Sequence, residues 1–186
     1  GAVAAAVTTS ASAVREAGAF VAASGAQQDG ASASLTAPNG SSQRRLLLSV
    51  RLEAEVRRGD VRYQEAHGTG TGLGDPIEVG SAVEVMARAS AGCREGRGLA
   101  CGSLKANLGH MEAMAAGGGL SVVLKVVLDR SVTTPSAELR LRNAHLKMLM
   151  RREECLFGRE AGLLAGLRGG GESSGLNSFG FSGTIG

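Results

Sequence analysis

Apolar and polar positions along the chain predict helices and strands that alternate. Apolar residues recur at helical spacing in several stretches, and short apolar runs bounded by glycine or polar loops are typical of buried strands. This alternation indicates an α/β layered fold. The pattern predicts helices over 1–17, 41–57 and 111–128, a further helix that opens at 75–78, and strands over 19–24, 61–66 and 99–104.

Two of these helices carry additional signals. At the start of the helix at 75–78, Asp75 can act as the cap, Pro76 suits the first helical position, and Glu78 can reach back to the amide of the cap. The helix over 111–128 is apolar on every side, which indicates a central, buried position. Its glycines at 117–119 would let another backbone pack closely, at a cost in helix propensity.

Length and composition narrow the class of protein. The 186 residues suggest one domain, and 43% hydrophobic with 20% charged residues is ordinary for a globular chain. The longest apolar stretch, 113–128, is too short for a membrane span and contains Lys125. Three cysteines without paired spacing argue against a disulfide scaffold and suit a reducing, intracellular compartment. One Tyr, four Phe and no Trp disfavour single-strand nucleic-acid binding, despite a net charge of +3.

The ends of the sequence suggest a piece of a longer polypeptide. The chain begins at Gly1 without a methionine, and it stops at Gly186 just after a strong glycine-rich pattern. Its first residues lack a basic start, so a secretory signal is a poor fit. We therefore interpret the chain as part of a larger protein.

Two histidines occupy matching positions and are the main candidates for chemistry. His67 follows a predicted strand and precedes a glycine-rich loop, whereas His110 ends a second such loop and begins a helix. Glycines beside them would let a ligand approach the backbone. The helix dipole at His110 favours neutral imidazole, which can donate a hydrogen bond to an oxyanion, and Lys105 acts in the same direction.

Other interpretations of these residues are weaker. The loop after His67 has Asp75 where a dinucleotide fingerprint needs its third glycine, so a phosphate cradle is not supported. The histidines are far apart in sequence, and the cysteines have no metal-binding spacing. His145 has no glycines around it and is interpreted as structural. We expect no metal.

Several motifs resemble those of β-ketoacyl synthases. Residues 65–78 (EAHGTGTGLGDPIE) look like the first histidine motif of that family, and residues 102–112 (GSLKANLGHME) look like the second. Residues 177–184 (NSFGFSGT) resemble its C-terminal glycine-rich loop. Residues 28–30 (QDG) and 35–40 (LTAPNG) match a stretch typical of polyketide synthase ketosynthases. The order and spacing agree, and the match is clearest over 19–86, 99–128 and 177–184, so residues 1–186 are interpreted as a partial ketosynthase domain.

The resemblance implies a thiolase-like α/β fold, of which this chain is the C-terminal half, with a mixed sheet and a buried central helix. It implies decarboxylative Claisen condensation of an acyl thioester with malonyl-acyl carrier protein. It also implies that no cofactor is bound and that phosphopantetheine is presented by the acyl carrier protein. By resemblance, the catalytic residues are His67, His110, Lys105 and Glu112, and the substrate-binding residues are Thr69, Thr71 and Phe181.

The chain also departs from the family. The family's nucleophilic cysteine lies in the N-terminal half, and neither Cys93, Cys101 nor Cys155 matches its motif. Residues 130–176 depart from the pattern as well. Two hypotheses stay open: a ketosynthase fragment that needs its missing N-terminal half, and a non-catalytic structural subunit of a larger assembly. A homodimer is compatible with both, and neither involves nucleic acid or a membrane span.

The catalytic hypothesis makes a geometric prediction. The facing ring nitrogens of His67 and His110 should lie within roughly 7 Å, so that both reach one thioester oxygen. The strands over 61–66 and 99–104 must then be neighbours whose loops leave the same edge of the sheet.

Overall fold

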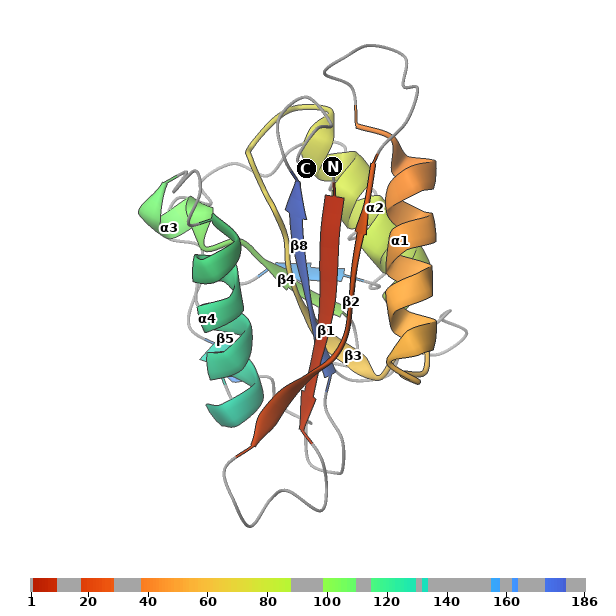
Figure 1. Ribbon diagram of the computed structural model, residues 1–186. Helices are drawn as coiled ribbons and strands as arrows, with labels where there is room; N and C mark the ends of the chain where they lie inside the picture. The colour runs from red at the N-terminus through yellow and green to blue at the C-terminus, as the bar shows by residue number, and fades with distance from the viewer. Residues whose placement is uncertain are drawn as a thin grey trace.

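A mixed β-sheet with helices on both faces forms the body of the chain (Figure 1). The structure is a computed structural model, and it describes residues 2–9, 18–28, 38–87, 99–109, 115–129, 132–133, 155–157, 162–163 and 173–179. Its strands are β1 (Ala2–Thr9), β2 (Ala19–Gln27), β3 (Val61–Glu65), β4 (Leu99–Gly102), β5 (Val132–Thr133), β6 (Cys155–Phe157), β7 (Gly162–Leu163) and β8 (Ser173–Phe179). Its helices are α1 (Gly40–Glu53), α2 (Gly74–Met86), α3 (Lys105–Leu108) and α4 (Ala115–Asp129).

The main sheet has the strand order β2-β1-β8-β3-β4-β6. β1 pairs antiparallel with β2 and with β8, whereas β8, β3, β4 and β6 run parallel to one another. β5 and β7 form a separate antiparallel pair. The predicted mixed sheet is therefore confirmed.

The first predicted helix is wrong, because residues 2–9 form strand β1. Alanine favours a helix in isolation, but here both edges of the segment are paired, with β2 on one side and β8 on the other. In the paired strand, three apolar side chains are buried: Ala4, Ala6 and Val7. Tertiary pairing thus overrides local propensity.

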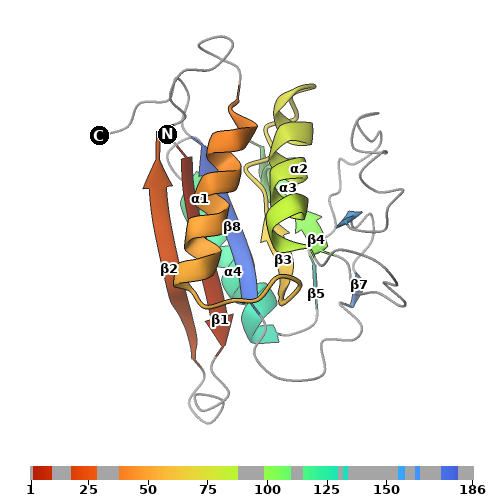
Figure 2. The same ribbon diagram turned by 90° about the vertical axis from the view of Figure 1, so that its right-hand side faces the viewer.

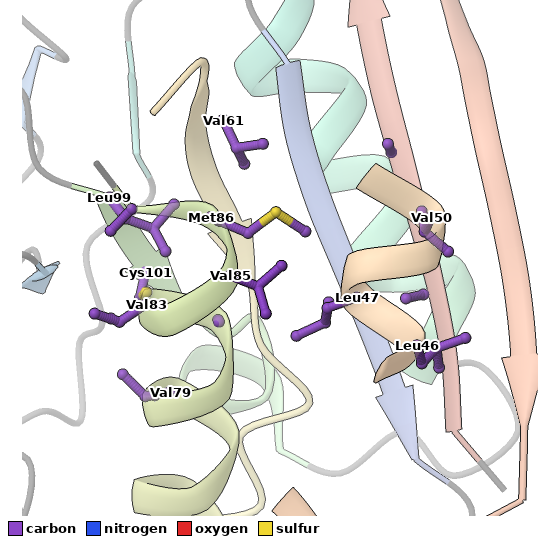
Figure 3. Packing of buried hydrophobic residues seen from close by; sticks show 14 of the residues in the cluster. Leu46, Leu47, Val50, Val61, Val79, Val83, Val85, Met86, Leu99 and Cys101 are labelled. Atoms are coloured by element: carbon purple, nitrogen blue, oxygen red, sulfur yellow. The ribbon is translucent and has the colours of Figure 1, made fainter. Parts of the chain in front are cut away.

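Helices α1 and α2 lie side by side on one face of the sheet (Figure 2). The Asn39 side chain caps α1 by accepting a hydrogen bond from the Ser42 amide at 3.1 Å. Figure 3 shows the core beneath them, where leucines and valines of both helices meet side chains of the sheet. This cluster includes Leu46, Leu47, Val50, Val79, Val83, Met86, Val61, Leu99 and Cys101.

Helix α4 covers the opposite face of the sheet (Figures 1 and 2). Four valines bury against Tyr63 and Val7: Val122, Val123, Val126 and Val127. The outward positions Gly117, Ser121, Lys125 and Leu128 are exposed, so within this chain α4 is enclosed on one side rather than on every side. Among the described residues, no helix is long and apolar enough to cross a membrane.

The close approach predicted for the glycines of this helix occurs at Gly119. A β-carbon added there would lie 2.6 Å from Leu176 Cδ1 and 3.2 Å from Glu65 Cγ. Glycine therefore lets α4 lie against β8 and β3 at a separation that a side chain would prevent.

Candidate active site

Strands β3 and β4 place two loops at one edge of the sheet. They are parallel neighbours, with Glu65 opposite Gly102, and the Ala66 amide continues the ladder by donating to the Gly102 carbonyl at 2.8 Å. The predicted adjacency of these strands is confirmed, although the second one ends at Gly102 rather than at Leu104. The carboxyl ends of parallel strands in an α/β sheet are where ligands usually bind.

The first loop is held by the buried carboxylate of Glu78. Its two oxygens accept hydrogen bonds from the amides of His67 at 2.7 Å and Gly68 at 3.0 Å. The Asn177 amide group of β8 donates to the same carboxylate at 3.4 Å. The prediction that Glu78 would bind the cap amide of its own helix is wrong: α2 begins at Gly74, the N-cap residue Leu73 makes no side-chain cap hydrogen bond, and the Glu78 carboxylate binds the loop instead.

The carboxyl group of Glu78, which holds the first loop, has a raised pKa. Burial raises its pKa to about 7, and the charge of Asp75 acts in the same direction. The hydrogen bonds from the Gly68 and His67 amides and from Asn177 favour the charged form, but they do not offset the loss of solvation. The loop that carries His67 is therefore tied to a carboxyl group that titrates near neutral pH.

The His67 ring is oriented by strand β8. The Phe179 amide donates a hydrogen bond to Nδ1 of His67 at 3.3 Å, and the two rings meet edge to face with their centroids 5.4 Å apart. An Nδ1 that accepts must be unprotonated, so the neutral ring carries its proton on Nε2. The backbone thus selects the tautomer that presents a donor at the far side of the ring.

Glycines bring the two loops into contact. Gly68 has a φ of +52°, and a β-carbon there would lie 2.6 Å from Ser103 Cβ and Oγ in the second loop. Only glycine fits both the backbone conformation and the space. The Ser103 hydroxyl is buried at this contact and has no hydrogen-bond partner among the described residues.

Thr69 and Thr71 lie exposed on the first loop. Thr71 Oγ1 accepts from the Gly74 amide at 3.1 Å, which stabilises the start of α2, while Asp75 Oδ1 accepts from the Gly70 amide at 3.2 Å. The predicted cap residue Asp75 therefore binds the loop instead of its helix. The Thr71 hydroxyl keeps its proton to donate, so exposed hydroxyl donors are available to a ligand that carries carbonyl groups.

A second carboxylate, Glu65, holds the second loop. One oxygen accepts from the Leu104 amide at 2.6 Å, and the other accepts from the Tyr63 hydroxyl. Burial raises the pKa of Glu65, whereas these hydrogen bonds and the charge of Lys105 oppose the rise. Burial also lowers the pKa of Lys105, against the attraction of Glu78 and Glu65. Lys105 therefore lies within the electrostatic reach of both carboxyl groups.

The structure places four of the predicted site residues at this one edge: His67, Thr69, Thr71 and Lys105. His110, Glu112 and Phe181 lie outside the described residues, so the predicted distance between the two histidine rings stays a prediction. Cys93 is outside them too, and Cys101 is buried in β4. Within the described ranges, no group of three or more His, Cys, Asp or Glu side chains is arranged for a metal.

Sequence reasoning missed the residues that support the site. All four supporting residues, Glu65, Glu78, Asn177 and Phe179, belong to the quoted motifs, but the sequence predicts a role only for Glu78, and that role is a different one. Their signal was their place in those motifs: Glu65 comes two residues before His67, and Asn177 and Phe179 open the third motif. Which of them lie next to His67 depends on the pairing of β8 with β3, which the sequence alone does not show.

Residues 18–140 match the family described as Beta-ketoacyl synthase, C-terminal domain. The spectinabilin polyketide synthase system protein NorA' of Streptomyces orinoci is 50% identical over 105 residues, which cover 56% of this chain and 3% of that protein. The pikromycin polyketide synthase component PikAII of Streptomyces venezuelae is 49% identical over 100 residues, covering 54% of this chain and 2% of that protein. The chain thus spans a few per cent of the length of these relatives.

Solved ketosynthase structures are similar to this chain in fold. The oxazolomycin ketosynthase domain OzmH KS7 of Streptomyces albus superposes with a TM-score of 0.66 at 26% identity, covering 88% of this chain and 30% of that one. The ketosynthase from module 1 of the bacillaene synthase of Bacillus amyloliquefaciens gives 0.66 at 27% identity, covering 87% and 32%. The predicted thiolase-like architecture is confirmed, and the chain spans about a third of each ketosynthase.

Proposed function

Because the chain belongs to the family of β-ketoacyl synthase C-terminal domains, we propose that it supplies the histidine half of a condensing active site. Residues 18–140 match the family, and the relatives belong to polyketide synthases. The nucleophilic cysteine would come from an N-terminal half outside this chain. The alternative of a non-catalytic structural subunit has no observation in its favour at the described part of the site.

The observation that carries the proposal is the tautomer of His67. The Phe179 amide donates to Nδ1, so the proton of the neutral ring is on Nε2, which makes Nε2–H the donor of this ring. A neutral donor of this kind stabilises an oxygen that gains negative charge, which is what forming an enolate from a thioester requires. Glu78 keeps the backbone of His67 in place, and Lys105 adds positive charge nearby.

The proposed reaction has two steps. The malonyl thioester loses carbon dioxide, and the electrons of the broken C–C bond form an enolate whose oxygen accepts hydrogen bonds from His67 and His110. The enolate carbon then attacks the carbonyl of an acyl group held on the cysteine, and the thiolate leaves. Lys105 and Glu112 support the histidines electrostatically. The substrates arrive as thioesters on an acyl carrier protein, whose phosphopantetheine arm Thr69 and Thr71 contact, with Phe181 as the gate.

The test combines this chain with a ketosynthase N-terminal half that carries the cysteine, and it measures carbon dioxide release from a malonyl thioester and formation of the condensation product. We expect His67→Ala to lower decarboxylation about a hundredfold or more, because it removes one oxyanion donor. His67→Gln, which restores an N–H donor, should recover part of the rate. His145→Ala, a histidine outside the motifs, is the matched control and should keep it.

Two results would overturn the proposal. One is a His67→Ala variant that decarboxylates at the unmodified rate. The other is condensation by the chain without the added half, together with a covalent acyl adduct on Cys93, Cys101 or Cys155, because the cysteine would then lie in this chain.

A further inference from the structure

A groove of about 420 Å³ is lined by residues of α1 and α2 and by Arg58. These two helices lie on the face of the sheet opposite α4 (Figure 2). Four arginines line the groove, and the only carboxylate among its lining residues is Glu84. Arg44, Arg45 and Arg51 project from one side of α1, while Arg58 follows the helix in the chain. The groove is therefore strongly basic, although the chain as a whole has a net charge of only +3.

Each of these arginines makes a hydrogen bond within the chain that orients its side chain. Arg44 Nη2 donates to Ser41 Oγ at 3.2 Å, and Arg45 Nη2 donates to Ser42 Oγ at 3.3 Å. Arg58 Nε donates to the Ala87 carbonyl at 2.6 Å, and Arg51 Nη1 donates to the Val56 carbonyl at 3.3 Å. Arg51 Nε is buried without a hydrogen-bond partner in the described part of the chain. Guanidinium groups oriented in this way lose less conformational freedom when they bind carboxylates, and they can do so through two nitrogens at once.

Two apolar side chains, Leu48 and Val85, also line the groove. Leu48 is 41% exposed, and Leu52, one turn further along α1, is 61% exposed. The stretch of α1 that lines the groove runs from Ser41 to Arg51, about 15 Å at the rise of an α-helix. A groove that follows α1 over this length and is lined by both arginines and apolar side chains fits an amphipathic protein segment better than a compact anion.

Glu84 gives a further reason to exclude a phosphate ligand. It forms an ion pair with Arg44 across the groove, 3.4 Å between Nη1 and Oε2, with both side chains partly exposed. A carboxylate inside the groove would repel a phosphate group, whereas spaced carboxylates on a peptide can avoid it. Because the pair is exposed, it is weak enough for Arg44 to exchange partners.

We propose that this groove docks an acidic amphipathic segment of another polypeptide, with its carboxylates on Arg44, Arg45, Arg51 and Arg58 and an apolar side chain on Leu48. The proposal does not depend on the chemistry assigned to His67, because the groove is built only from α1, α2 and the residues that follow α1.

The experiment measures binding of a fluorescent peptide to the 186-residue chain by anisotropy. The peptide is an acidic helix of about four turns, with glutamates on one side and two leucines between them. A scrambled peptide of the same composition controls for net charge. We expect the binding of the acidic helical peptide to weaken as salt is added. We also expect this peptide to bind more tightly than the scrambled one.

Variants of the chain test whether the peptide binds in the groove or is attracted only by the overall positive charge. The double variant Arg45→Glu/Arg58→Glu should weaken binding at least tenfold, because it reverses two exposed positive charges that line the groove. Arg57→Glu is the matched control: its side chain is 89% exposed, pairs with Asp60 and does not line the groove, so binding should change little. Leu48→Ser should weaken binding of the acidic helical peptide but not of the scrambled one.

Three results would overturn the proposal. The peptide does not bind; the scrambled peptide binds equally well; or inorganic phosphate displaces the peptide at matched ionic strength while Leu48→Ser has no effect. The last result would identify a site for phosphate-bearing ligands instead of a protein segment.

Discussion

The two loops at the edge of the sheet are held by the same chemical device in different surroundings. In each, a buried glutamate accepts a hydrogen bond from a backbone amide: Glu78 from His67 and Gly68, and Glu65 from Leu104. Glu78 comes from helix α2 and binds two consecutive amides. Glu65 comes from the strand itself, and the Tyr63 hydroxyl and the charge of Lys105 stabilise it. The first loop is therefore held at His67 and Gly68 by a carboxyl group from a neighbouring helix, whereas the second is held by a carboxyl group from the strand that precedes the first loop.

The largest expected effect comes from removing the anchor of the first loop. Glu78→Ala leaves the amides of His67 and Gly68 without their acceptor, and each buried donor left unpaired costs about 1–3 kcal/mol. We expect the free energy of unfolding to fall by about 2–5 kcal/mol in urea titrations. Glu84→Ala, on the exposed side of the same helix, should change it by less than about 0.5 kcal/mol. Equal effects of the two variants would mean that Glu78 does not anchor the loop.

The protonation of Glu78 gives the next prediction. Its pKa is raised from 4.5 to about 7 in the folded chain, so the folded state holds a proton that the unfolded state has lost between these pH values. Stability is therefore greatest below about pH 4.5, decreases as the pH rises toward 7, and is level above it, with a total loss of about 3 kcal/mol from this group.

Glu78→Gln removes this titration while keeping one oxygen as an acceptor. The difference in unfolding free energy between the unmodified chain and this variant should therefore change between pH 4.5 and 7 and stay constant above. A difference that is independent of pH over this range would contradict the raised pKa.

Gly119→Ala tests the support of the second loop. The added methyl group would meet Leu176 and Glu65, at a cost of about 1–3 kcal/mol for overpacking, while alanine returns up to about 1 kcal/mol of helix propensity. We expect a net loss of about 1–2 kcal/mol, together with faster hydrogen exchange at the Leu104 amide. Gly117→Ala, on the exposed side of α4, is the control and should raise stability slightly. A stabilising Gly119→Ala would show that α4 can move away from Glu65.

The smallest effect is expected at the start of α2. Thr71→Ala removes the acceptor of the Gly74 amide and should lower the unfolding free energy by about 1 kcal/mol, whereas Thr71→Ser keeps the hydroxyl and should change it little. If both substitutions destabilise equally, the threonine methyl group rather than the hydrogen bond is responsible.

The amino-acid sequence by itself predicts much of this arrangement. The segments before His67 and Lys105 were predicted as the strands that are β3 and β4, the glycines indicated the loops, and the long motifs indicated the family. Helices α1 and α2 were also found, with the first ending four residues earlier than predicted. These features are local, because they follow from spacing, backbone freedom and turn chemistry within a few residues.

Other features depended on tertiary structure for physical reasons. Residues 2–9 are rich in alanine and gain nothing as a strand until β2 and β8 supply hydrogen bonds on both sides. Glu78 lies at a suitable position for a helix cap, yet the loop amides of His67 and Gly68 come within reach only when β3 packs beside α2. The tautomer of His67 depends on the Phe179 amide, which is 112 residues away in the chain. Sequence determined which side chains the site has, and long-range contacts decided which atoms they bind.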